Sequence, residues 1–233
     1  MKTLLKTFSV YGIIYLILLA IVLELLYTTP KEELHLLMNS HHMAIEDTFF
    51  KYYSTMAEWP LYILALLPLL WKQIQMTLFF AMSELTSGSI LQILKHLFSA
   101  DRPVSVFEHH GHVLLPLVQG VDMHHSNSFP SGHAATFFVF FTCCALLLAY
   151  HYKKNPDLLT PSKKYIVRLT MLALVIMAAL GAYSRVYLSQ HFMSDVCVGS
   201  IIGFVSPCLL FFFVWNWICR VSKKLELKIK RNK

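Results

Sequence analysis

Long apolar runs, separated by more polar stretches, dominate the sequence. The hydrocarbon core of a bilayer is about 30 Å thick, and a helix needs about 20 residues to cross it. Six runs approach that length, at residues 8–27, 56–71, 76–97, 130–150, 165–182 and 196–219. The second run is the shortest, and Pro60 interrupts it. We therefore expect an all-α fold, an integral membrane bundle of six transmembrane helices.

The composition agrees with this expectation and excludes several classes of protein. Only 14% of the residues are charged and 56% are hydrophobic, whereas soluble domains carry about 25% charged residues. A disordered chain needs the opposite composition. The net charge of +7 does not indicate nucleic-acid binding, because the basic residues stand at the edges of the apolar runs. No repeat or linker divides the chain, so we expect residues 1–233 to form a single domain.

The distribution of lysine and arginine predicts which side of the membrane each loop faces, because cytoplasmic loops carry an excess of these residues. With a cytoplasmic N-terminus and six spans, fifteen of the twenty cations fall on the inner side. The outer side receives the other five, which are Lys31, Lys51, Lys95, Arg102 and Arg185. Both termini are therefore expected in the cytoplasm, and the two long loops, roughly residues 28–55 and 98–129, are expected to face outward.

Polar residues gather at four places, and the expected topology puts all four at the outer surface. These places are Lys95 with Arg102-Pro103, the start of the fourth run, Ser184-Arg185, and His191 with Asp195. Charge in or beside a membrane span is costly and usually functional. Each feature alone has an ordinary explanation, such as a lysine that snorkels to the headgroups. Their concentration on one face indicates a polar site.

The residue types at these places suit the binding of phosphate. Lys95, Arg102 and Arg185 supply three cations at one level, and guanidinium groups match phosphate oxygens bidentately. The fourth run opens with the residues Pro-Ser-Gly-His at 130–133. Proline is expected at the first helical position there, and the free amides of a helix start bind anions.

The same clusters contain groups that suit phosphoryl transfer. His191 and Asp195 are four residues apart, so they are expected to share one face of a helix. The carboxylate then accepts the N–H of one ring nitrogen and leaves the other nitrogen as a nucleophile. His133 supplies a second imidazole, placed to protonate a leaving oxygen.

Three motifs, in this order, resemble those of the type-2 phosphatidic acid phosphatase superfamily, which also contains vanadium haloperoxidases. Residues 95–103 read K-x6-R-P, residues 130–133 read P-S-G-H, and residues 184–195 read S-R-x5-H-x3-D. The resemblance covers a signature core at about residues 75–205, and no signature residue is missing. It implies metal-independent hydrolysis of a phosphomonoester or pyrophosphate through a phosphohistidine intermediate, without a cofactor.

The resemblance also implies a role for each motif residue of this chain. His191 would attack phosphorus, Asp195 would orient it, and His133 would protonate the leaving group and then activate water. The phosphate oxygens would be held by the remaining motif residues, which are Lys95, Arg102, Ser131, Gly132 and Arg185.

A site at the membrane surface predicts a membrane lipid phosphate as the substrate. The resemblance implies lipid A phosphate, undecaprenyl pyrophosphate, phosphatidylglycerol phosphate or phosphatidic acid, and the long histidine-rich loop favours the first two. The expected location is a bacterial inner membrane with the site facing the periplasm. Besides the substrate and the bilayer, no obligate protein partner is expected.

Several alternatives stay open at this point. A lipid phosphotransferase would use the same phosphohistidine, and a haloperoxidase-like enzyme would bind vanadate at the site. The polar third span would suit a transporter, although transporters break their helices at the membrane midplane, and paired histidines would suit haem. A metal site is another alternative, suggested by the loop histidines His109, His110, His112, His124 and His125. No familiar ligand spacing accompanies these histidines, so no metal is expected.

Overall fold

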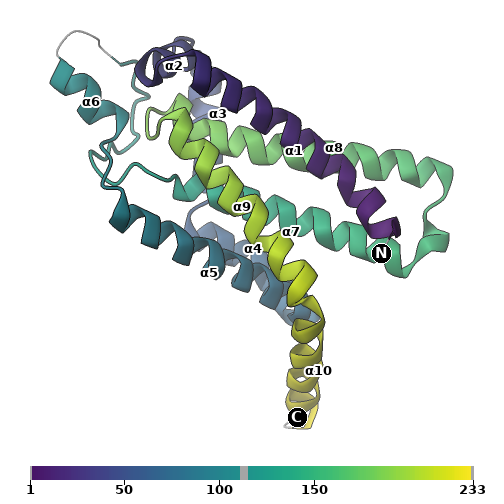
Figure 1. Cartoon of the computed structure of the whole chain (residues 1–233). Coiled ribbons are helices and arrows are strands. Elements are labelled where there is room, and N and C mark those ends of the chain that lie inside the picture. The colour runs from purple at the N-terminus through teal and green to yellow at the C-terminus, as the bar shows by residue number, and fades with distance from the viewer. Residues whose placement is uncertain (1, 111–114, 232–233) are drawn as a thin grey trace.

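The computed structural model describes residues 2–110 and 115–231, and these ranges form helices without any strand (Figure 1). The elements, in chain order, are α1 (Lys2–Thr28), α2 (Lys31–Met38), α3 (Ala44–Thr55), α4 (Trp59–Lys72), α5 (Ile74–Leu97), α6 (Pro103–His110), α7 (Gly132–Lys154), the 3-10 turn η1 (Pro156–Leu158), α8 (Pro161–Tyr187), α9 (Met193–Phe213) and α10 (Trp215–Arg231).

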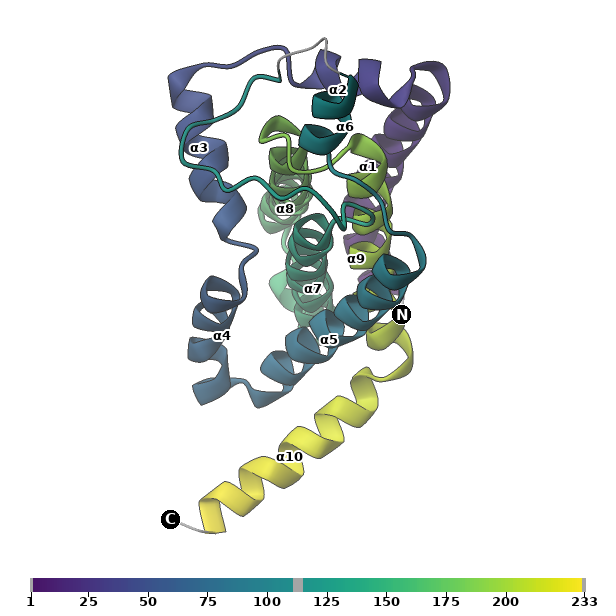
Figure 2. The same cartoon turned by 90° about the vertical axis from the view of Figure 1, so that its left-hand side faces the viewer.

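Five of the described helices, α1, α5, α7, α8 and α9, are long and apolar enough to cross a membrane. The second predicted run instead forms α4, which has 14 residues. At 1.5 Å per residue it is about 21 Å long, less than the thickness of a bilayer core. In Figure 2, α4 nevertheless leads the chain from the level of α3 to the start of α5. The all-α membrane fold is confirmed, whereas the count of six spans, which needs α4 as a span, and the cytoplasmic termini stay predictions.

The sixth predicted span is wrong at its C-terminal boundary. The run 196–219 does not form one helix, because α9 ends at Phe213 and α10 begins at Trp215. The buried Trp215 ring stacks on Phe211 with ring centroids 5.4 Å apart, and it meets Phe79 edge-on. This aromatic packing holds the chain where it turns, and α10 then leaves the bundle (Figure 2).

α7 lies in the middle of the bundle, where it packs against α1, α5, α8 and α9. α9 approaches it closely through Gly199 and Gly203. A Cβ on Gly199 would collide with the carbonyl oxygen of Ser131, the N-cap of α7. A Cβ on Gly203 would collide with the carbonyl oxygen of Ala135 in α7. Small residues four apart are typical of tightly packed helices in membranes. The contact fixes the start of α7 beside the start of α9.

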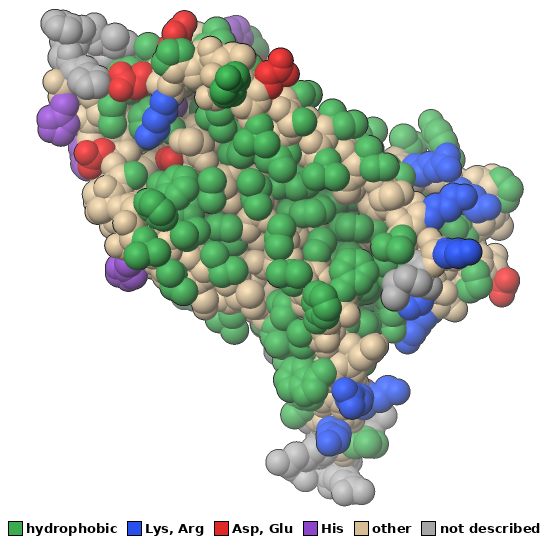
Figure 3. All heavy atoms as spheres, viewed as in Figure 1, with side chains coloured by type: hydrophobic (Ala, Val, Ile, Leu, Met, Phe, Trp, Pro, Cys, Tyr) green, Lys and Arg blue, Asp and Glu red, His purple; other side chains and the backbone are tan. Residues whose placement is uncertain are grey.

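The face of the molecule that Figure 3 shows is divided into three zones. Hydrophobic side chains cover the middle, lysine and arginine gather at one end, and histidine and acidic residues gather at the other. At the basic end, Lys2, Lys6, Lys164 and Arg168 line a common hollow. The opposite end, where α5 ends and α7 and α9 begin, is called the motif end below. The N-terminus lies at the basic end (Figure 1), the arrangement that the lysine and arginine count predicts.

Candidate active site

The P-S-G-H motif forms the turn before α7, and one expectation about it is wrong. Pro130 does not occupy the first helical position. It follows a cis peptide bond, and α7 begins at Gly132 with Ser131 as its N-cap. The Ser131 hydroxyl oxygen accepts the Ala134 N–H at 3.4 Å, a role that serine fills better than most residues. The first amides of the helix, at Gly132 and His133, then have no intrahelical acceptor.

The turn before α7 is attached to the beginning of α9. The backbone amide of Ser131 donates to the carbonyl oxygen of Asp195 at 3.0 Å. Ser131 is fully buried, and its hydroxyl hydrogen stays available because the oxygen acts as the acceptor in the cap. Two of the three motifs are therefore joined directly through the backbone.

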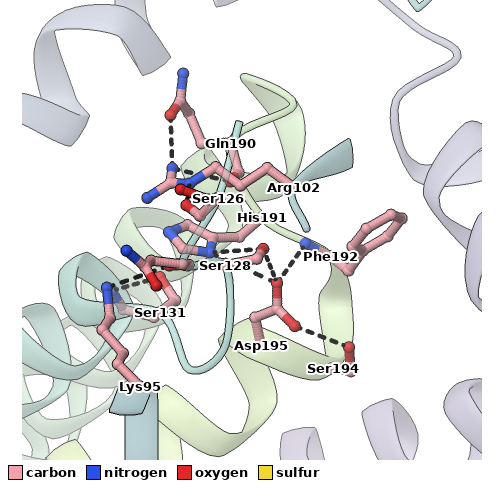
Figure 4. A network of polar contacts seen from close by, with 12 residues as sticks. Lys95, Arg102, Ser126, Ser128, Ser131, Gln190, His191, Phe192, Ser194 and Asp195 are labelled. Carbon is pink, nitrogen blue, oxygen red and sulfur yellow. Dashed lines mark hydrogen bonds and ion pairs between the residues drawn. The ribbon is translucent and has the colours of Figure 1, made fainter. Parts of the chain in front are cut away.

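The S-R-x5-H-x3-D motif runs from the end of α8 to the first turn of α9, where it brings a histidine and a carboxylate together (Figure 4). Nδ1 of His191 lies 3.6 Å from Oδ2 of Asp195, and both side chains are buried. His191 precedes α9, so the pair meets across a helix start and not along a shared helix face. The Phe192 amide donates to the same carboxylate oxygen at 3.1 Å, which fixes the carboxylate toward the ring.

Ser128 completes this group, although none of the motifs includes it. Its hydroxyl donates to Oδ2 of Asp195 at 2.5 Å, and the Ser128 hydroxyl oxygen itself lies 3.4 Å from Nδ1 of His191. Since Nδ1 faces the carboxylate and the hydroxyl, Nε2 is the ring nitrogen directed away from both. The only signal in the sequence is a serine two residues before Pro130, which no spacing rule singles out.

The surroundings keep the His191 imidazole neutral. Burial lowers the pKa of His191 to about 4, although the hydrogen bond with Asp195 acts in the opposite direction. A ring with that pKa is uncharged near pH 7. A histidine nucleophile needs this state, because a protonated ring has no free lone pair.

Arg102 lies against the same loop and is held by neutral oxygen atoms (Figure 4). Its Nε donates to the carbonyl oxygen of Ser126 at 3.0 Å. Its Nη1 donates to the carbonyl oxygen of Gln190 at 3.1 Å and to Oε1 of Gln190 at 3.0 Å. These partners orient the guanidinium without cancelling its charge. Gln190, which the motifs do not indicate, therefore aligns one of the three predicted cations.

His133 and Arg185 line a polar cavity of about 300 Å³, together with Gln190. His133 is within electrostatic reach of His191 and of all three predicted cations. Arg185 is 7% exposed, and its Nε has no hydrogen-bond partner among the residues that the structure describes. A buried donor without a partner needs an explanation, and an anionic ligand in this cavity supplies one.

The remaining predicted groups lie around this centre. Lys95 Nζ donates to the carbonyl oxygen of Asn127 at 3.4 Å, beside the turn that carries Ser128. His124 lines the cavity, whereas the His125 ring contacts Ser105. Among the side chains that the structure describes, no three His, Cys, Asp or Glu form a group that could hold a metal; the side chain of His110 and the whole of His112 lie outside that description. Every predicted site residue is found at the motif end.

The family model described as the PAP2 superfamily matches residues 76–219. The chain is similar to the crystal structure of Aquifex aeolicus LpxE, with a TM-score of 0.58 and 22% identity over 78% of this chain and 94% of that chain. It is also similar to a transmembrane PAP2-type phosphatidylglycerolphosphate phosphatase from Bacillus subtilis, with a TM-score of 0.58 and 20% identity over 90% of this chain and 96% of that chain. No curated protein sequence matches the chain significantly.

These comparisons bear on the fold and the family. At 20–22% identity the two solved structures show a shared fold. The family match covers more than half of the chain and includes all three motifs, so the resemblance seen in the sequence is confirmed. The chain therefore belongs to the PAP2 superfamily, in which it is a membrane-embedded phosphatase.

Proposed function

We propose that this protein hydrolyses a lipid phosphate at the outer face of the membrane, through a phosphohistidine on His191 and without a metal ion. One observation carries the proposal. The buried His191–Asp195 pair follows Gln190, which lines a polar cavity together with His133 and with Arg185, whose Nε has no hydrogen-bond partner among the described residues. The family match and the similarity to a phosphatidylglycerolphosphate phosphatase support it.

In the first step of the proposed reaction, the phosphate oxygens bind to Arg102, Arg185 and Lys95. Ser131 and the amide of Gly132 complete the cradle. Nε2 of His191 attacks phosphorus, and the bond between phosphorus and the leaving oxygen breaks. His133 gives its proton to that oxygen, since it lines the same cavity. Asp195 stabilises the positive charge that develops on the imidazole.

In the second step, His133 takes a proton from water, and the resulting hydroxide attacks the phosphohistidine. Inorganic phosphate is released, and His191 returns to its neutral form. Fixed cations and amides stabilise the charge of a transferring phosphoryl group. The three basic side chains therefore supply what metal ions supply in other phosphoryl-transfer enzymes.

This account predicts that a chelator has no effect. Phosphate release from a panel of purified lipid phosphates is expected to stay within about twofold of the control value after treatment with EDTA, because protein cations hold the phosphate. A loss of activity that added metal restores would contradict the metal-independent mechanism. A second lipid, added as an acceptor, distinguishes a phosphatase from a phosphotransferase. A phosphotransferase would phosphorylate the second lipid without releasing inorganic phosphate.

A second observation supports a lipid substrate. An apolar groove of about 280 Å³ lies between α4 and α7, lined by residues such as Ala57, Ala65 and Phe140. It continues the polar cavity: Thr55 and Glu58 line the cavity, whereas Met56 and Ala57, next to them in the chain, line the groove. We infer that the phosphate of the substrate occupies the cavity and that its hydrocarbon chain follows the groove.

Filling this groove is expected to affect long-chain substrates selectively. Ala65→Phe should lower kcat/KM for a long-chain lipid phosphate by about tenfold, the usual size of an overpacking effect. Short-chain, water-soluble phosphatidic acid should change by less than about twofold. The matched control is Ala179→Phe, which fills the separate apolar groove near α1 and α9. If Ala179→Phe lowers the activity toward the long-chain lipid and Ala65→Phe does not, the hydrocarbon chain of the substrate binds in the groove near α1 and α9 instead.

The proposed location is a bacterial inner membrane, with the site facing the periplasm. The basic end lies opposite the motif end (Figures 1 and 3), and cytoplasmic surfaces of membrane proteins carry the excess of lysine and arginine. The apolar middle zone between the two ends supports a location within the bilayer.

A further inference from the structure

One wall of the polar cavity carries charged residues that the proposed reaction does not use. α3 and the turn after it contribute Lys51, Thr55 and Glu58 to the lining. Glu58 is exposed to solvent, and its carboxylate interacts electrostatically with Arg185 across the cavity. A negative charge beside a phosphate site requires an explanation, because it opposes the binding of anions.

In the proposed binding mode the leaving group faces this wall, because the groove for the hydrocarbon chain begins at Met56 and Ala57, next to Glu58 in the chain. His133, which protonates the leaving oxygen in the proposed reaction, lines the same cavity as Glu58. The cavity of about 300 Å³ exceeds the space that one phosphate group of five heavy atoms needs, since a single water occupies about 30 Å³. The remaining volume therefore accommodates the atoms that follow the leaving oxygen.

This wall has no net positive charge to offer a second phosphate, because Glu58 and Lys51 carry opposite charges. Asp122 also lines the cavity. Lys51 is the cation on the same wall, but its ammonium group donates to the carbonyl oxygen of Gln119 at 2.9 Å. It lies so close to Gly120 that a Cβ there would collide with it. Lys51 thus holds the loop against α3 and supplies one positive charge, which the Glu58 carboxylate on the same wall matches in number.

We propose that Glu58 is a specificity-determining residue that favours phosphomonoesters over diphosphates. The inference rests on the proposed function. In a monoester the bond between phosphorus and the ester oxygen breaks, the oxygen takes the His133 proton, and a neutral alcohol leaves. In a diphosphate the leaving group is itself a phosphate anion, which the carboxylate repels. The substrate class is then a lipid with a terminal phosphomonoester, and not a polyprenyl diphosphate.

Glu58 also has a structural role that the experiment must separate from selectivity. Its backbone carbonyl accepts the Tyr62 amide at 3.0 Å at the start of α4, where a negative side chain is favourable. Loss of the negative side chain at the start of α4 would change the stability of the protein. A change in stability would alter the activities toward both substrates equally. The ratio of activities toward the two substrates is therefore the informative measurement.

The test uses farnesyl monophosphate and farnesyl diphosphate, which share one hydrocarbon chain. The purified full-length protein in detergent is assayed by phosphate release. Glu58→Gln keeps the shape and removes the charge, and it should raise the diphosphate-to-monophosphate ratio of kcat/KM about threefold to fivefold, the size of one screened charge. Glu58→Asp, which keeps the charge, should retain the wild-type ratio and covers the case in which Glu58→Gln does not fold. Glu33→Gln is the matched control, because Glu33 lies in the first turn of α2, outside the cavity lining.

An unchanged ratio in Glu58→Gln, a ratio that falls, or an equal rise in Glu33→Gln would overturn the role of Glu58. A Glu58→Asp variant with a raised ratio would also contradict it. Failure of the proposed function looks different, because the wild-type protein would then release phosphate from neither substrate.

Discussion

Replacing His191 with alanine should lower kcat for lipid phosphate hydrolysis by about 10⁴-fold or more, as expected when a covalent nucleophile is removed. The side chain is buried and neutral, with Nδ1 toward Asp195 and Nε2 directed away from it. No other described imidazole is held by a carboxylate in this way at the cavity, so no neighbour replaces it. Phosphate release during long incubations of the purified variant measures the residual rate.

His125→Ala is the control for this experiment. Its ring lies at the motif end but contacts Ser105 and lies 3.8 Å from Glu108, so its loss should change the rate by less than about twofold. Rapid quenching should trap a phosphoryl group on the peptide that contains His191 in the wild type, and on no peptide of the alanine variant. Near-normal turnover of His191→Ala would remove the proposed nucleophile.

The meeting of the predicted site residues could be anticipated from the sequence for a topological reason. Arg102 follows the third apolar run, His133 stands at the start of the fourth, and His191 precedes the sixth. The third–fourth and fifth–sixth connections are separated by two spans, so they lie on the same side of a membrane. The contact itself depends on packing that charge counting does not reveal. Gly199 and Gly203 let α9 approach α7, so the turn before α7 and the loop before α9 come within hydrogen-bond distance.

The residues that align the site were not predictable in the same way. Ser128 and Gln190 are neutral loop residues, and their roles arise from contacts with Asp195 and Arg102 across 67 and 88 positions of the chain. No periodicity or charge pattern marks such positions. The break between α9 and α10 was hidden for a related reason. Asn216 is the one polar residue in the run 211–219, and ring packing at Trp215 turns the chain.

Arg185→Met should separate activity from stability. An arginine that stabilises a transferring phosphoryl group contributes about 10³- to 10⁵-fold to the rate, so kcat/KM should fall by about 10³-fold. The guanidinium is nearly inaccessible to solvent, and its Nε has no partner among the described residues. Burying a charge without full compensation is unfavourable, and an unbranched apolar side chain of similar length avoids that cost. The Tm of the variant should therefore equal or exceed the wild-type value.

Ligand binding gives this prediction a second measurement. Inorganic phosphate should raise the Tm of the wild-type protein, because a ligand that binds only the folded state stabilises it, and the shift should be lost in Arg185→Met. Arg168→Met is the control, since Arg168 lines the hollow at the basic end, and both its activity and its phosphate-induced shift should match the wild type. If Arg185→Met lost stability in parallel with activity, the arginine would be a structural residue. A buried cation that weakens the empty protein and stabilises the occupied one is instead what a phosphate site requires, because the anion supplies the missing partner.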